Sequence, residues 1–133
     1  MLRCASIGAG AAAFLLDAGF AHAQSSREEI IKAAAVKSVA LYDEMAACMD
    51  TAEFREVGFA PEGPCTEMTS RIFELEAYDG YLLEAGYPCV AGFFGRIYAE
   101  NFDGYGGTGK APFGTIDPEW AGKFEDCRQM LEN

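Results

Sequence analysis

Histidine is nearly absent from this chain of 133 residues, and its single occurrence is His22. Beyond that position the chain has no imidazole to act as the base of a Ser-His-Asp or Cys-His nucleophile system. It also lacks imidazole metal ligands and the side chain that ordinarily titrates near neutral pH. The sequence therefore predicts no catalytic residue of these kinds, and we expect no metal and no cofactor.

Basic residues are scarce as well. After residue 23 the chain has nine Lys and Arg residues against 20 Asp and Glu residues, a net charge of −11. Such a surface repels nucleic acid and anionic lipid, so neither is expected as a partner. It would attract a basic protein or peptide, although solubility alone is the more ordinary reason for a high net charge.

Long apolar runs are missing except at the N-terminus. Residues 5–20 are small or apolar apart from Asp17, a positive Met1-Leu2-Arg3 precedes them, and Ala21-His22-Ala23 follows. This layout is typical of a secretory signal peptide, and the run is too short for a permanent membrane span. We expect cleavage after Ala23, a single domain over residues 24–133, no membrane insertion after cleavage, and a periplasmic or secreted location. The alternative is a buried N-terminal helix.

Four of the five cysteines lie after the expected cleavage point, at positions 48, 65, 89 and 127. An even count in an exported chain indicates disulfides. The gaps of 17, 24 and 38 residues do not form the close pairs that a four-thiolate zinc site uses.

Helical periodicity dominates the mature chain and predicts an all-α fold, a small disulfide-stapled bundle of three to four helices. Capping signals support the boundaries: Ser26 and Glu29 form a capping box, Thr66 can cap a second helix, and Asp117-Pro118 opens the last one. Gly86 is a natural stop. Pro88 can occupy the first turn of a third helix, for which a strand is the alternative. The expected helices cover residues 27–49, a short turn after Asp50-Thr51, 67–85, a stretch from 88, and a last helix from 118.

An up-and-down bundle of these helices decides between the three cysteine pairings. Cys48 and Cys65 would lie at one end, and Cys89 and Cys127 at the other. A helix over residues 67–85 would separate Cys65 from Cys89 by about 30 Å, far more than a disulfide spans. The predicted pairs are Cys48–Cys65 and Cys89–Cys127.

A glycine-rich loop over residues 103–118 precedes the last helix, and a loop this long in so small a domain is functional or flexible. Tyr105 and Phe113 are flanked by glycines and fit no helix face. We expect them to be aromatic anchors of a binding surface, with Asp103 and Asp117 at its rim. The alternative is that the two rings fold down to seal the core.

Other motifs in the sequence give weaker indications of function. Residues 104–110 spell G-x-x-x-x-G-K, but Ala111 stands where a phosphate loop needs Ser or Thr. Asn101-x-Asp103 is similar to the opening of a calcium loop, but Pro112 stands at the twelfth position, where a standard loop needs an acidic residue. A looser calcium site that uses Asp103 and Asp117 is an alternative. Carboxylates also crowd residues 67–85, where a solvated face is the ordinary explanation. They are Glu74, Glu76, Asp79 and Glu84.

Together these features predict a non-catalytic binding module of the cell envelope or periplasm that engages a basic protein. Inhibitor, immunity, chaperone and accessory proteins are the matching types. The alternative is a small envelope enzyme or a calcium-dependent domain that uses the acidic residues.

Overall fold

The computed structural model describes residues 2–59, 63–101 and 111–133, with side chains from Ser26 onward. Within these residues it contains six α-helices, one 3-10 helix and no strand, which confirms the all-α prediction. Residues 1–30 and 31–133 form two units, and the second contains the hydrophobic core. The helices are α1 (Leu2–Met49), α2 (Ala52–Val57), the 3-10 helix η1 (Thr66–Met68), α3 (Thr69–Glu76), α4 (Asp79–Glu84), α5 (Gly92–Asn101) and α6 (Pro118–Glu132).

Helix α1 ends at Met49, as predicted, but it does not begin at Arg27. The residues before Ser26 are helical too, so Ser26 is not at a helix N-terminus and the capping box is not formed in the full chain. The reason is that this preceding stretch is rich in alanine, the best helix former. Apolar residues recur along α1 at steps of three and four, and Ala34, Leu41 and Met45 among them are buried in the core.

Helix α2 begins as the capping pattern predicts. The Thr51 hydroxyl accepts a hydrogen bond from the Phe54 amide at 3.2 Å, and Phe54 is fully buried. This short helix therefore serves mainly to insert one aromatic ring into the core.

The helix predicted over 67–85 is divided into η1, α3 and α4. Thr66 is not at the N-cap position, because it is the first residue of η1 and follows the N-cap Cys65; its hydroxyl donates to the Gly63 carbonyl at 2.9 Å. The α3–α4 junction tightens where the Tyr78 amide bonds the Leu75 carbonyl, three residues back rather than four. The predicted stop is confirmed: Gly86 has φ +89°, and its amide and that of Tyr87 close the end of α4 on Leu83 and Leu82.

Helix α5 begins at Gly92, so the expectation that Pro88 occupies its first turn is wrong. The physical reason lies in α4. Both carboxylate oxygens of Asp79 accept hydrogen bonds from backbone amides, from Ala91 at 2.7 Å and from Gly92 at 2.9 Å. An acidic side chain from another helix thus satisfies the amides at the start of α5 and favours its dipole. The strand alternative does not apply to these residues.

Helix α6 agrees with prediction. Asp117 is its N-cap and accepts a hydrogen bond from the Glu119 amide at 2.9 Å, and Pro118 is the first helical residue. Trp120, Phe124 and Cys127 recur at helical spacing along α6 and are buried in the core.

The two predicted disulfides are present. Cys48 and Cys65 join the end of α1 to the segment before α3, with Cα atoms 5.8 Å apart. Cys89 and Cys127 join the segment before α5 to α6, with Cα atoms 5.6 Å apart.

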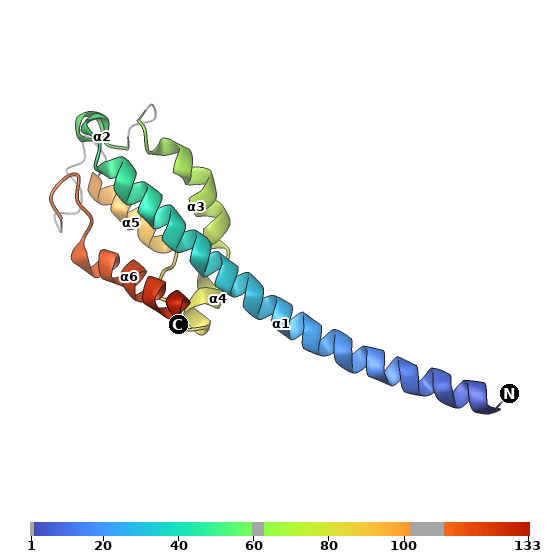
Figure 1. Cartoon of the computed structure of the whole chain (residues 1–133). Coiled ribbons are helices and arrows are strands. Elements are labelled where there is room, and N and C mark those ends of the chain that lie inside the picture. The colour runs from blue at the N-terminus through green and yellow to red at the C-terminus, as the bar shows by residue number, and fades with distance from the viewer. Residues whose placement is uncertain (1, 60–62, 102–110) are drawn as a thin grey trace. The chain divides into compact units, whose positions relative to one another are not determined.

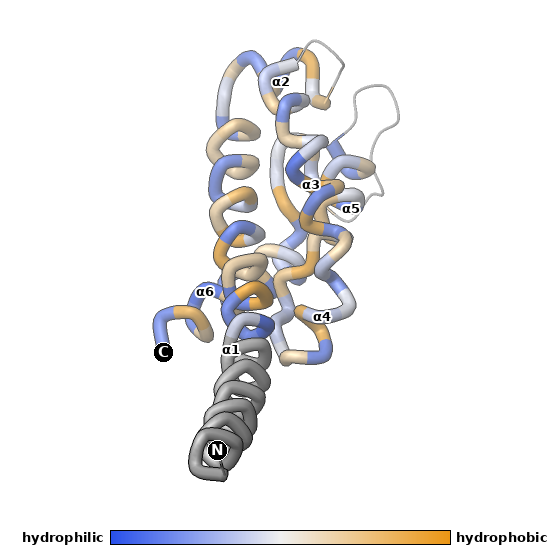
Figure 2. The backbone as a smooth tube through the Cα atoms, turned by 90° about the vertical axis from the view of Figure 1, so that its right-hand side faces the viewer, coloured by the Kyte–Doolittle hydropathy of each residue, from blue (hydrophilic) through white to orange (hydrophobic). Residues whose placement is uncertain are grey.

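Figure 1 shows α3 and α6 on either side of the second part of α1, an arrangement that ion pairs from α1 to both helices support. Figure 2 shows apolar and polar residues alternating along these helices, as expected when one face of each is buried.

Within the described residues, no helix is both long and apolar enough to cross a membrane.

Candidate binding surface at the loop before α6

The four residues predicted to form a binding surface are divided by what the structure describes. Asp103 and Tyr105 lie outside the described residues. Phe113 and Asp117 are described, and they stand on the last part of the loop, between α5 and α6.

Asn101 fastens this end of the loop to α5. Its side chain is fully buried, and its Oδ1 accepts a hydrogen bond from the Gly114 amide at 2.7 Å. Its Nδ2 donates to the carbonyls of Ile97 at 3.0 Å and Thr115 at 3.2 Å. Gly114 has φ +85°, a conformation that favours glycine. The buried side-chain amide of Asn101 therefore fixes the backbone around Phe113.

Phe113 is partly exposed, and the ring of Phe54 lies beneath it. It is 45% exposed, and its ring stacks on that of Phe54 with centroids 5.8 Å apart and an interplanar angle of 10°. Phe54 is itself buried. The ring of Phe113 thus covers the core with one face, and the rest of the ring is exposed to solvent. The sequence posed two alternatives, an anchor of a binding surface or a ring that seals the core, and this placement has features of both.

Asp117 is mainly a structural residue. It is 8% exposed, and its carboxylate caps α6. A capping carboxylate at a helix N-terminus contributes to helix stability. Its placement offers little surface to a partner.

The rings beneath Phe113 connect it to the first disulfide. Phe54 meets Phe59 edge to face at 4.9 Å, and Phe59 stacks on Tyr98 at 3.9 Å. The Tyr98 hydroxyl donates to the Cys65 carbonyl at 3.3 Å. This aromatic end, defined as Phe54, Phe59, Tyr98 and Phe113, therefore lies against the Cys48–Cys65 bridge.

The chemistry open to the described residues is limited. All four cysteines after residue 23 are in disulfides, so none of them offers a thiolate nucleophile. Among the described residues, no group of three or more His, Cys, Asp or Glu side chains is placed to hold a metal ion.

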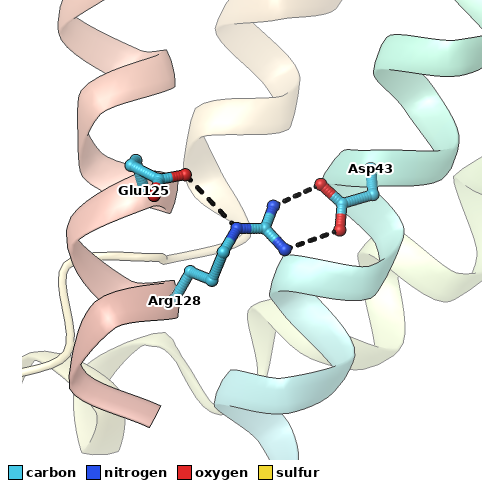
Figure 3. Close-up of polar contacts among 3 residues, drawn as sticks. All are labelled: Asp43, Glu125 and Arg128. Carbon is cyan, nitrogen blue, oxygen red and sulfur yellow. Dashed lines mark hydrogen bonds and ion pairs between the residues drawn. The ribbon is translucent and has the colours of Figure 1, made fainter. Parts of the chain in front are cut away.

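A polar cluster joins α1 to α6 (Figure 3). The Arg128 guanidinium forms a two-point hydrogen-bonded ion pair with the Asp43 carboxylate, and its Nε donates to Glu125 at 3.3 Å. Beside it, Tyr42 stacks on Phe124 with centroids 4.4 Å apart. Partial burial, followed by the negative charge of Asp43, raises the pKa of the Tyr42 hydroxyl. This cluster is half exposed, and it connects α1 to α6.

The acidic residues of the 67–85 segment divide by role. Asp79 caps α5, whereas Glu74, Glu76 and Glu84 are exposed. The same segment exposes three large apolar side chains that sequence reasoning had not singled out as surface residues. They are Phe73 at 65%, Leu83 at 60% and Tyr81 at 49% exposure.

Comparison with protein-family models, with curated proteins and with solved structures gave no significant match for this chain.

Proposed function

We propose that this protein is an exported, non-catalytic binding domain that engages a basic protein in the periplasm or cell envelope. The observation that carries the proposal is Phe113, an exposed ring held on a buried one by a fully bonded asparagine. An aromatic anchor that is fixed before binding loses little entropy when a partner covers it. Tyr105 and Asp103 complete the proposed surface within the glycine-rich loop.

Two features support the compartment and the class of partner. Two disulfides in a domain of this size favour an oxidising location, and the N-terminal residues have the order of a signal peptide. The net charge of −11 favours a basic partner and disfavours nucleic acid.

The export part is tested by producing the full chain in a bacterial host and measuring the mass of the purified protein. Removal of the segment through Ala23 would leave Gln24 as the new N-terminus, with the four remaining cysteines oxidised. An intact N-terminus with free thiols would contradict export.

The binding part is tested by capture from an envelope extract on the immobilised oxidised protein, with salt raised in steps. We expect basic proteins to be captured and released as salt rises. Phe113→Ala should weaken capture by about 2 kcal/mol, a loss typical of a hot spot, whereas Met130→Ala, a similarly exposed side chain on α6, should not. Capture that salt does not affect would contradict the role of charge.

A further inference from the structure

We infer that the outer face of α3 and α4 is a docking surface for a basic, amphipathic protein segment. This acidic aromatic face is defined by the aromatic side chains Phe73 and Tyr81 and the carboxylates Glu74, Glu76 and Glu84. It shares with the proposed function only the basic character of the partner. The surface is a different one, so the two proposals can fail separately.

The first observation is the density of exposed apolar side chains. Three of the large apolar residues that the structure leaves exposed lie within residues 73–83. Phe73 stacks on no other ring among the described residues, and its exposure of 65% is the highest of these side chains. A single exposed apolar residue is ordinary, whereas several on one short stretch are typical of interaction sites.

The second observation is the backbone that presents them. Helices α3 and α4 follow one another across Ala77 and Tyr78, and both linking residues keep right-handed helical angles. The inward face is filled by Ile72, Leu75 and Leu82, all buried. Phe73 and Tyr81 lie off this buried stripe. Leu83 is exposed too, but it lies on the opposite side of α4 from Tyr81, because residues two apart on a helix do not face each other. Asp79 ties α4 to the start of α5, which holds the face in place.

The third observation is charge. Residues 66–87 are all described, and their single basic side chain, Arg71, is in an ion pair with Glu44 of α1. Glu74, Glu76 and Glu84 are exposed on the same segment. Protein interfaces commonly have an aromatic centre and a polar rim, and a uniformly acidic rim selects Lys and Arg on the partner.

The same charges decide against other occupants. A second copy of this chain would bring one acidic rim against another, and like charges in contact disfavour association. Anionic lipid and nucleic acid are repelled for the same reason. The occupant that fits is a segment with apolar side chains on one side and Lys or Arg beside them.

The test uses the purified oxidised protein and a fluorescently labelled amphipathic peptide of Leu and Lys, with a Leu and Glu peptide of the same pattern as control. We expect the Lys peptide to bind and the Glu peptide not to bind. The double variant Phe73→Ala/Tyr81→Ala should weaken binding about thirtyfold, in the range of lost hot spots. The matched double variant Val36→Ala/Met130→Ala, which trims exposed apolar side chains on α1 and α6, should change affinity less than about twofold.

Charge is tested with two triple variants that remove equal net charge. Glu74→Gln/Glu76→Gln/Glu84→Gln should weaken binding more than the control triple does. The control triple neutralises exposed acids elsewhere and consists of Glu56→Gln, Asp126→Asn and Glu132→Gln. Thermal melting of every variant verifies that it folds.

Three results would overturn the inference. They are equal loss in both triple variants, no loss in Phe73→Ala/Tyr81→Ala, and no preference of the wild type for the Lys peptide. Loss on Phe113→Ala alone would place the interface at the loop, which would leave the proposed function standing and remove this one.

Discussion

The aromatic end and the acidic aromatic face both expose phenylalanine rings, but they differ in what lies beneath them. Phe113 rests on the buried ring of Phe54, and the Asn101 amide holds its backbone. Phe73 stands on the solvent side of α3, while its neighbour Ile72 points into the core. Exposure alone therefore does not separate a ring that also covers the core from a ring that faces solvent only. The support underneath a ring makes that distinction.

The two regions also differ in covalent anchoring. The aromatic end lies against the Cys48–Cys65 bridge through Tyr98. The acidic aromatic face is followed by the segment that the Cys89–Cys127 bridge ties to α6. Substitutions at each bridge, and at the polar contacts near it, test how far the two regions differ in stability.

The largest effects are expected from the bridges. Cys89→Ala/Cys127→Ala opens a separation of 38 residues and should lower the free energy of unfolding by about 4 kcal/mol in the loop-entropy model. Cys48→Ala/Cys65→Ala opens a separation of 17 residues and should cost about 3 kcal/mol. Urea denaturation of both variants checks this order. A clearly greater loss from the shorter bridge would mean that its enthalpic contacts with the aromatic end dominate.

The next effect concerns the asparagine under Phe113. Asn101→Ala should lower the free energy of unfolding by about 2–3 kcal/mol, because a fully buried side chain is removed and the part-buried Gly114 amide and Thr115 carbonyl lose their partner. Gln129→Ala, which removes an exposed amide on α6, is the control and should stay within about 0.5 kcal/mol. Equal midpoints for the two variants in urea would contradict the role of Asn101.

The ion pair between α1 and α6 should contribute less. Arg128→Gln removes its contacts with Asp43 and Glu125, yet all three side chains are substantially exposed. Pairs of this kind contribute up to about 1 kcal/mol, and salt weakens them. Unfolding measured at low and high salt should show the difference from wild type shrinking as salt rises. A loss that salt leaves unchanged would instead indicate lost packing of the Arg128 stem.

The smallest expected effect is on the pH dependence of the unfolding free energy, and it comes from Tyr42. Its pKa is raised in the folded state, so the unfolded chain releases this proton first as the pH rises. The contribution of Tyr42 is therefore complete below about pH 10 and is lost above it, as the pH rises through the folded pKa. Unfolding free energies measured between about pH 8 and about pH 11 should fall less steeply for Tyr42→Phe than for wild type. Identical slopes would contradict the raised pKa.

Much of the fold was predictable because its signals are local. The caps at Thr51 and Asp117 and the stop at Gly86 each act on amides or carbonyls a few residues away. The disulfide pairing was predictable because the expected order of the helices places Cys48 and Cys65 at one end of the bundle and Cys89 and Cys127 at the other. The start of α5 was missed because its capping carboxylate, Asp79, lies 12 residues before the amide it binds.

The candidate site was predictable only in part. The glycine-rich surroundings singled out Phe113, but its stacking on Phe54 depends on a contact across 59 residues of sequence, which spacing does not reveal. Phe73 carried a signal that could have been used. The apolar stripe takes Met68, Ile72 and Leu75, which leaves Phe73 off the stripe and on the solvent side. An aromatic residue in such a position is a better guide to a surface than the number of acidic residues around it.

The most direct test of this account is the free energy of unfolding of Phe113→Ala measured beside that of Phe73→Ala. Phe113→Ala should lose about 1–2 kcal/mol, less than a fully buried phenylalanine because half of the ring is already in solvent. Phe73→Ala should stay within about 0.5 kcal/mol of wild type, because its ring covers no core. Equal losses, or a greater loss for Phe73→Ala, would contradict the distinction between a ring that also covers the core and a ring that faces solvent only.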